Sequence, residues 1–340
     1  MNRYTSWRSR MLRAGRDAGI ALIAVAAACD ASSAAAPADV SPADVPPASV
    51  ITGTKLYVNP ENPARKQAIA WRDSRPADAQ LMQQMAAQPV AIWITEWAQD
   101  VHATVARYVS KAAAQNATPV FVAYNIPNRD CGSYSAGGTS SASAYRSWIR
   151  QFAAGLSGRS IVILEPDAVA GADCLSAAAR AERFSLLKDA VTVLKAANAS
   201  VYLDGGHAGW QSADVMARRL TSSGLAAADG FSLNVSNYVS TSSNESYGNK
   251  ISSLTGGKHY VIDTSRNGLG GNGGDWCNVP GQSLGREPTT STGKALVDAY
   301  LWIKVPGESD GTCNGGPEAG AWWAKYALEL ARNDLQLASR

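Results

Sequence analysis

Seven short apolar segments alternate with longer stretches of helical composition between residues 90 and 305, and this alternation constrains the fold more than any other feature. Each segment is a continuous run of aliphatic, β-branched and aromatic residues, which is typical of parallel strands buried on both faces. The stretches between them, such as 144–156 and 181–198, repeat apolar residues every three or four positions, as amphipathic helices do. The pattern predicts an α/β fold, a distorted and incomplete TIM-like parallel β/α barrel of about seven strands. The predicted strands are 90–96, 118–125, 160–167, 200–206, 229–236, 258–265 and 299–305.

A polar residue stands at or near the end of every predicted strand. The carboxyl ends of the strands of a parallel barrel share one rim, and the active sites of such barrels lie there. The alternative is that Asp and Asn end strands because turns favour them, which would account for some of these residues but not for a ring of carboxylates accompanied by Trp and Lys. The residues are Glu96, Asn125, Asp167, Asp204, Asn234, Asp263 and Lys304.

Charge and composition restrict the kind of partner. The net charge is +3 and the charges are scattered, so no basic stripe is available to bind nucleic acid. Only three histidines are present and no two have the spacing of metal ligands, so we expect no metal and no other cofactor. Ten Trp against four Phe favours a sugar-binding cleft, because Trp suits half-exposed sites where the ring face is used. A packing role for many of the ten is an equally good interpretation.

The N-terminal region has the features of an export signal. Arginines are frequent in the first residues, and the apolar run that follows is too short to cross a bilayer. We expect a signal peptide over 1–29, a low-complexity linker over 30–50 and one catalytic domain over 51–340. Cys29 stands at the end of the apolar run, where either lipid attachment or ordinary signal cleavage fits the sequence. The protein is expected to be a secreted monomer, whose only membrane contact would be a lipid on Cys29.

The other four cysteines lie in the expected catalytic domain. In an exported protein two disulfides are a better interpretation than nucleophilic or metal-binding roles. The predicted pairs are Cys131 with Cys174 and Cys277 with Cys313.

Three aspartates are candidates for hydrolysis of a glycosidic bond, which needs an acid on the leaving oxygen and a base or nucleophile on the other face of the sugar. Asp167 directly follows a hydrophobic strand, so partial burial should raise its pKa. Asp130, beside Cys131, would lie on a neighbouring loop and add a second negative charge. Asp310 follows the last strand in a loop flanked by glycine and could act as a base.

Six motifs in order resemble glycoside hydrolase family 6, the inverting cellulases, whose catalytic domain is a distorted barrel with fewer than eight strands. The resemblance extends from about Tyr57 to the end of the chain. The motifs are YNIPNRDCG (124–132), LEPD (164–167), LDGGHAGW (203–210), NVSNY (234–238), GDWCN (274–278) and WIKVPGESDG (302–311).

The resemblance implies a role for each matched residue. Asp167 is implied to be the general acid, Asp130 to raise its pKa, and Asp310 to match a base whose identity in the family is disputed. Tyr124 matches a tyrosine that presses on the distorted sugar, and Asp204 a supporting carboxylate. A packed or structural residue is the alternative at each position of the sugar-binding set. That set is Trp93, His207, Trp210, Asn234, Trp276, Lys304 and Glu308.

Loop length bears on whether cleavage occurs within the chain or at its end. Processive members of the family carry a long insertion after the motif that contains Asp310, whereas here only GTCNGGPE separates Asp310 from residues 319–323. The sequence therefore predicts an open cleft and an endoglucanase acting on soluble or amorphous β-1,4-glucan. Two rivals are a glucan-binding lipoprotein that has lost catalysis and a barrel hydrolase that acts on another β-linked polysaccharide.

Overall fold

The computed structural model describes residues 49–271 and 273–338. The predicted signal peptide, Cys29 and nearly all of the predicted linker lie outside this range. No helix in the described residues is long and apolar enough to span a bilayer.

The described chain is built on one sheet of seven parallel strands in sequence order, as predicted. The sheet curls into an incomplete barrel, because β1 and β7 are joined only by an isolated bridge between Val90 and Trp302. One main-chain hydrogen bond, from Ala91 N to Trp302 O at 2.9 Å, crosses the same seam. The strands are β1 (Ile92–Ile94), β2 (Val120–Ala123), β3 (Ile161–Leu164), β4 (Ser200–Asp204), β5 (Gly230–Leu233), β6 (His259–Asp263) and β7 (Val297–Leu301).

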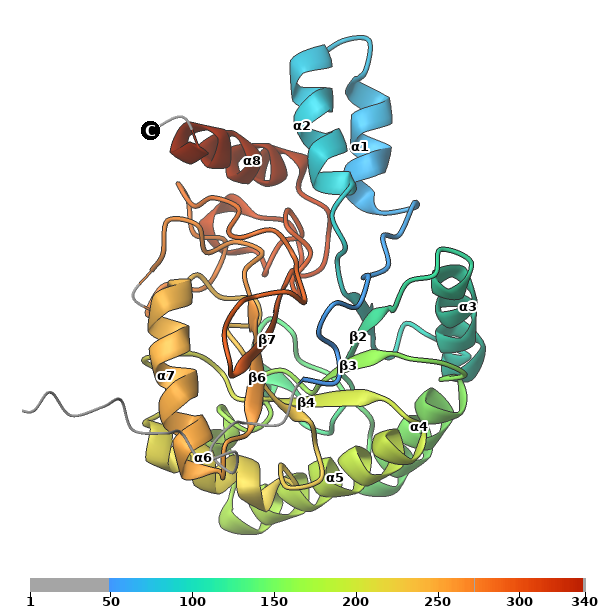
Figure 1. Ribbon diagram of the computed structural model, residues 1–340, viewed down its shortest axis with the longest axis vertical. Coiled ribbons are helices and arrows are strands. Elements are labelled where there is room, and N and C mark those ends of the chain that lie inside the picture. Colours follow the sequence, from blue (N-terminus) through green and yellow to red (C-terminus); the bar gives the residue numbers. More distant parts are fainter. Residues whose placement is uncertain (1–48, 272, 339–340) are drawn as a thin grey trace, which may run out of the picture. The chain divides into compact units, whose positions relative to one another are not determined.

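Helices cover the outside of the strands (Figure 1). The two helices predicted as 144–156 and 181–198 are present as α4 and α5, and most helices begin at a Ser, Asn or Asp whose side chain caps the first turn. Three short 3₁₀ turns, η2 (Asp130–Gly132), η3 (Ala172–Cys174) and η4 (Cys313–Gly315), lie in the loops. The helices are α1 (Pro63–Trp71), α2 (Pro76–Ala86), α3 (Val101–Ala113), α4 (Ala142–Ala154), α5 (Ala177–Ala196), α6 (Ala213–Ser222), α7 (Thr241–Leu254) and α8 (Ala324–Ala338).

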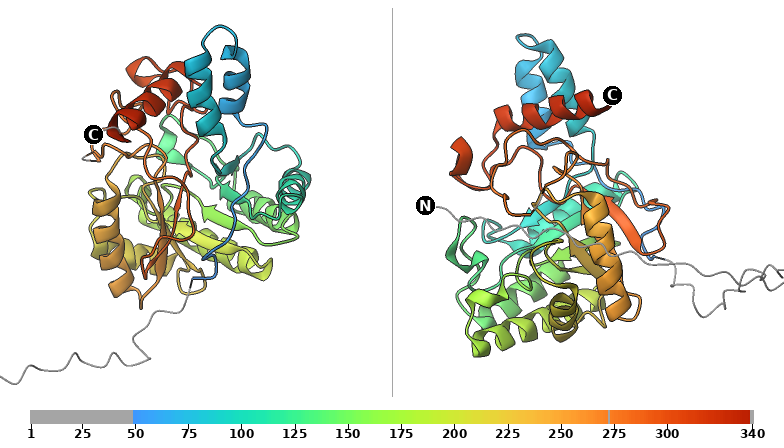
Figure 2. Two further views of the ribbon diagram at one scale, coloured as in Figure 1. Left: turned by 45° about the horizontal axis from the view of Figure 1, so that its top comes forward. Right: turned by 90° about the vertical axis from the view of Figure 1, so that its left-hand side faces the viewer.

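The side chains of each strand divide between two apolar layers. One layer fills the barrel interior and includes Val122, Ile163 and Val261, while the other lies between the strands and the outer helices. Both faces of the strands are buried, which explains why they appear in the sequence as continuous apolar runs. A third cluster joins α1, α2 and α8, which group together beside the barrel (Figure 2).

The last strand begins and ends earlier than the sequence predicts. The apolar run suggested 299–305, whereas β7 covers Val297–Leu301. Ile303 and Lys304 lie beyond the ladder because their main-chain N–H groups donate to the carboxylate of Asp263, at 3.2 and 2.9 Å. Asp263 thus turns the chain out of the sheet and brings Lys304 toward the rim.

Candidate active site

A groove of about 1050 Å³ runs across the carboxyl ends of the strands. Its walls come from loops that follow all seven strands and from the segment before α1. Ten of the twelve residues that the sequence analysis assigned to the site line it. They are Trp93, Tyr124, Asp130, Asp167, His207, Trp210, Trp276, Lys304, Glu308 and Asp310.

Asp167 follows β3 in a turn of left-handed backbone, with φ of 68°. Its side chain is partly exposed to the groove but is surrounded by protein on its other sides. Burial raises the pKa of Asp167 well above its ordinary value, and the negative charges of Asp204 and Asp130 raise it further. The carboxyl group is therefore held protonated, as a general acid must be before it acts.

Asp204 lies at the end of β4, directly beneath Asp167, and has no exposed surface. Its carboxylate accepts hydrogen bonds from the main-chain N–H of Asp167 at 3.0 Å, from that of Gly206 at 3.0 Å and from the Ser232 hydroxyl at 3.1 Å. Burial raises the pKa of Asp204 to about 7, and the three donors limit that rise. A negative charge on Asp204 favours the protonated form of Asp167, because the two adjacent carboxyl groups repel each other when both are ionised.

Asp130 is fixed in the loop after β2 by its own main chain and by the adjacent disulfide. It accepts a hydrogen bond from Ser135 N at 2.8 Å, and Cys131 is bonded to Cys174 in the loop after β3. This disulfide and the second one, Cys277–Cys313, are the two predicted pairs and are confirmed. Burial raises the pKa of Asp130 as well, so three acidic groups with raised pKa values share this side of the groove.

Arg129 organises the same loop and was not identified from the sequence. Its guanidinium pairs with both oxygens of Glu96 at 2.7 and 2.9 Å and donates to the carbonyl oxygen of Tyr124 at 2.8 Å. It also lies 4.5 Å from the centre of the Tyr124 ring. Arg129 thereby ties the ends of β1 and β2 to the loop that carries Asp130.

Tyr124 and Trp93 form the floor of the groove beside the acidic group. Their rings meet edge to face with centroids 5.2 Å apart, and the indole N–H of Trp93 donates to Ile303 O at 2.8 Å across the barrel seam. Beneath them, the buried Glu165 accepts from the main-chain N–H groups of Asn125 and Ile126, which fixes the turn after Tyr124. Glu165 is a second residue that the sequence analysis did not single out.

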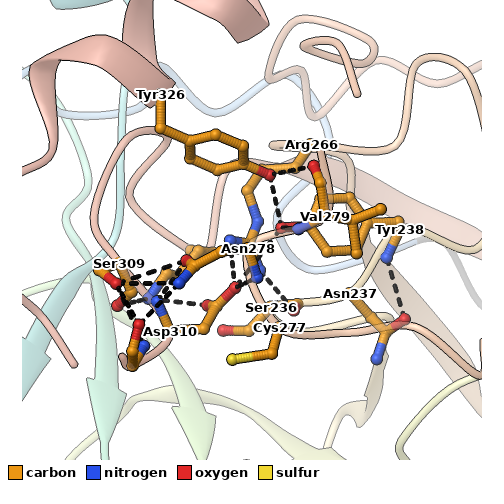
Figure 3. A network of polar contacts seen from close by, with 12 residues as sticks. Ser236, Asn237, Tyr238, Arg266, Cys277, Asn278, Val279, Ser309, Asp310 and Tyr326 are labelled. Carbon is orange, nitrogen blue, oxygen red and sulfur yellow. Dashed lines mark hydrogen bonds and ion pairs between the residues drawn. The ribbon is translucent and has the colours of Figure 1, made fainter. Parts of the chain in front are cut away.

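Asp310, on the opposite side of the groove, lies among positive charges. Its Oδ2 accepts from Arg266 Nη1 at 2.8 Å and from Asn278 N at 2.9 Å (Figure 3). Lys304 Nζ lies 3.3 Å from Oδ1. Burial alone would raise the pKa of Asp310, but Arg266 and then Lys304 outweigh it and hold that pKa below its ordinary value. Asp310 is therefore ionised at any pH at which the protein would work.

Arg266 is the third residue that the sequence analysis did not assign to the site. It is fully buried, its guanidinium lies 4.4 Å from the centre of the Tyr238 ring, and Nη2 donates to Ser236 O (Figure 3). The hydroxyl groups of Tyr238 and Tyr326 bond to each other at 2.7 Å above it. These contacts fix the cation that in turn fixes the carboxylate of Asp310.

Polar and aromatic residues complete the groove on either side. Burial raises the pKa of Glu308 to about 7, although Lys304 opposes the rise. His207 packs against Trp210 with ring centroids 5.4 Å apart, and burial lowers the pKa of this histidine. Trp276 is 40% exposed, which leaves its ring available to a ligand in the groove.

Asp204 and Asn234 are the two of the twelve residues that do not line the groove. Both side chains have no exposed surface, and neither lines the groove. Asn234 has a φ of 67° and its amide donates to Asp263 O at 2.9 Å, so it serves the turn after β5. The contacts of Asn234 match the turn-forming alternative, while Asp204 lies beneath Asp167 as a supporting carboxylate would. No group of three or more His, Cys, Asp or Glu side chains in the described residues could hold a metal ion.

The sequence of the chain is similar to those of known proteins. Residues 51–334 match the model of the family described as glycosyl hydrolases family 6. Endoglucanase A of Cellulomonas fimi is 46% identical over 281 residues, which cover 82% of this chain but only 61% of that protein. Endoglucanase 1 of Streptomyces halstedii is 39% identical over 289 residues, covering 81% of this chain and 88% of that one.

A solved structure extends the likeness to three dimensions. The endoglucanase Cel6 of Mycobacterium tuberculosis, in complex with methyl-cellobiosyl-4-deoxy-4-thio-β-D-cellobioside, superposes with a TM-score of 0.80 and 47% identity. The alignment covers 85% of this chain and all of that one.

Proposed function

Because the chain belongs to family 6 of the glycosyl hydrolases, we propose that it is an endo-β-1,4-glucanase that cleaves soluble or amorphous β-1,4-glucan with inversion of configuration. The observation that carries the proposal is the contrast between two aspartates of one groove. Asp167 is held protonated by burial and neighbouring negative charge, whereas Asp310 is held ionised by Arg266 and Lys304. An inverting glycosidase needs one carboxyl group in each of these states.

Asp167 donates its proton to the glycosidic oxygen of the bond that breaks. Its raised pKa keeps the proton in place until the leaving oxygen gains negative charge in the transition state. Asp204 and Asp130 act through Asp167, since their charges favour its protonated form. Tyr124, on the floor beside it, contacts the sugar at the point of cleavage.

Asp310 is the base that receives a proton from the attacking water. Its Oδ2 is occupied by Arg266 and Asn278, but among the described residues Oδ1 has only the 3.3 Å contact with Lys304. Oδ1 therefore retains a lone pair for a water molecule in the groove. The two cations that keep Asp310 ionised also lower its basicity, so its contribution rests on position as well as on charge.

The groove supports binding of a neutral sugar chain. Exposed aromatic rings suit the flat apolar faces of glucose units, and Lys304 and Glu308 provide hydrogen bonds to hydroxyl groups. The short segment between Asp310 and Ala319 supports cleavage within the chain, because it leaves little length to roof the groove. The N-terminal signal supports export, with Cys29 either lipidated at the cell surface or removed with the signal peptide.

The test uses the purified mature protein with soluble carboxymethyl cellulose. An endoglucanase lowers the viscosity steeply while few reducing ends appear, and proton NMR detects the α-anomer first because inversion converts the β-linkage. Release of cellobiose without a fall in viscosity, or initial formation of the β-anomer, would contradict the proposal. Xylan and mannan serve as control substrates, since preferential cleavage of either would assign the enzyme to another polysaccharide.

A further inference from the structure

The groove does not stop at Trp93 but continues to Trp97 in the loop between β1 and α3. Trp97 is 52% exposed, and its indole N–H donates to Trp93 O at 3.0 Å. An exposed Trp normally keeps its N–H for water or a ligand. Here the N–H is already satisfied, so the ring is held in place and what it offers the groove is an apolar face.

The described residues beside Trp97 do not offer a second free aromatic ring face. Tyr108 of α3 also lines the groove, but Arg107 lies 5.1 Å and Lys111 6.0 Å from the centre of its ring. Asn59 lines the other side and brings an amide. The arrangement is one free aromatic face with a polar rim, which is the composition of a carbohydrate site.

We propose that Trp97 forms an outer sugar-binding site, which stacks on a glucose unit of the same β-1,4-glucan chain beyond the unit bound at Trp93. The inference rests on the proposed function, because the occupant is the continuation of the substrate. Trp93 contacts the ring of Tyr124 and accepts a hydrogen bond from Trp97, and all three residues line the groove, which selects this occupant. A ligand long enough to reach Trp97 gains the stacking energy, and a shorter one does not.

If Trp97 binds a glucose unit, Trp97→Ala should weaken the binding of long oligosaccharides and leave the binding of short ones unchanged. We would measure binding of cellotriose and cellohexaose by calorimetry in the Asp167→Ala background, so that no hydrolysis occurs. Trp97→Ala is expected to weaken cellohexaose binding about five- to tenfold, the scale of one aromatic stacking contact. Cellotriose binding is expected to stay unchanged. Trp97→Phe keeps a ring and is expected to retain most of the affinity for cellohexaose.

Trp71→Ala is the matched control. Its ring is also partly exposed, but it lies at the end of α1 under the guanidinium of Arg75, 4.1 Å away, and does not line the groove. It should leave both affinities as they are. Product analysis gives an independent result, since Trp97→Ala in the active enzyme should change the ratio of cellotriose to cellobiose formed from cellohexaose.

Three outcomes would overturn the inference. Equal loss for both oligosaccharides would mean that Trp97 only supports Trp93, and no loss for either would mean that the ring binds nothing. Failure of the Asp167→Ala parent to bind cellohexaose at all would overturn the inference together with the proposed function. The first two outcomes leave the proposed function intact, so the two failures are distinguishable.

Discussion

The two sides of the groove shift the pKa of a carboxyl group in opposite directions. On the side built from the ends of β3 and β4, Asp167 lies near the acidic Asp204 and Asp130, and its pKa is raised well above its ordinary value. On the side formed by the loops after β6 and β7, Asp310 pairs with Arg266 and Lys304 and its pKa is lowered. Both groups are surrounded by protein, so burial alone does not distinguish them. The sign of the nearest charges decides which one keeps its proton.

On each side of the groove, main-chain N–H groups as well as side chains hold a carboxylate in place. Asp204 receives two backbone N–H groups, one of them from Asp167 itself. Asp310 receives the backbone N–H of Asn278, whose own side chain accepts from Asp310 N at 2.8 Å. The difference between the two sides is therefore built into the loops and should persist when a ligand displaces water.

Replacing the proton donor should give the largest effect. Asp167→Ala is expected to lower turnover of cellohexaose by about 10²- to 10⁴-fold, because general acid catalysis typically contributes that factor. Steady-state kinetics on the purified variant measures it. A nitrophenyl cellobioside needs less protonation of its leaving group, so its hydrolysis should fall less. Near-normal turnover of cellohexaose would remove Asp167 from the role of acid.

Replacing Asp310 and Asp167, one at a time, by asparagine should change the free energy of unfolding in opposite directions. Asp310→Asn leaves Arg266 buried without its counter-charge and is expected to lower the free energy of unfolding by about 3–5 kcal/mol at pH 7. Asp167→Asn is expected to raise it by about 1 kcal/mol, after allowance for the partial exposure of this group. The folded protein must keep a proton on Asp167 that the unfolded chain gives up above about pH 4, and Asn removes that cost.

Urea unfolding monitored by Trp fluorescence checks both variants. If the two amides change stability in the same direction, the contrast between the two sides of the groove does not arise from charge. An unchanged denaturant slope would show that neither variant altered the compactness of the folded or unfolded state.

The acidic side can be probed further through the pH dependence of activity. Asp204→Asn removes the negative charge beneath Asp167 while keeping an oxygen that can accept from its backbone N–H. The pKa of Asp167 should fall, and the alkaline limb of the kcat/KM profile should move to lower pH by about one unit. Asp130→Asn should move it in the same direction by less. An alkaline limb that stays in place would mean that Asp204 acts only as a hydrogen-bond acceptor.

The strands could be predicted from sequence because both of their faces are buried. A parallel strand between two apolar layers gives an uninterrupted apolar run, and six of the seven runs contain a whole strand while the seventh overlaps one. The run at 299–305 misplaced β7, because Trp302 and Ile303 are apolar for a different reason. Trp302 belongs to the cluster with α1, α2 and α8, and Ile303 fills the barrel interior beyond the last rung. Composition does not separate these cases.

The site was predictable only where a residue's role is encoded near it in the sequence. Asp167 follows a strand and Asp130 precedes a cysteine, and both positions carry local signals. No local sequence signal marked Arg266, because its partner Asp310 lies 44 residues away and the two meet only in the folded barrel. The signal at Asn234 was ambiguous, because a buried Asn that closes a turn and one that contacts a ligand both follow a strand.

Glu308 tests whether burial can outweigh a single cation. Lys304 serves Asp310 as well, and burial leaves the pKa of Glu308 at about 7. Between about pH 4.3, the ordinary value for Glu, and pH 7 the folded protein keeps a proton that the unfolded chain releases. Stability should therefore fall as pH rises through this window, and Glu308→Gln should reduce that fall by about 1–2 kcal/mol.

Unfolding at pH 5 and at pH 7.5 measures this difference for the parent and the variant. Asp310 should behave in the opposite way. Because its pKa is lowered in the folded protein, it stabilises the fold above about pH 4, and this stabilisation is lost as the pH falls further. Glu308→Gln should accordingly leave the acid transition below pH 4 unchanged, whereas Asp310→Asn should flatten it. If Glu308→Gln alters the acid transition instead, Lys304 is sufficient to hold both carboxylates ionised, and burial no longer sets the proton affinity on this side of the groove.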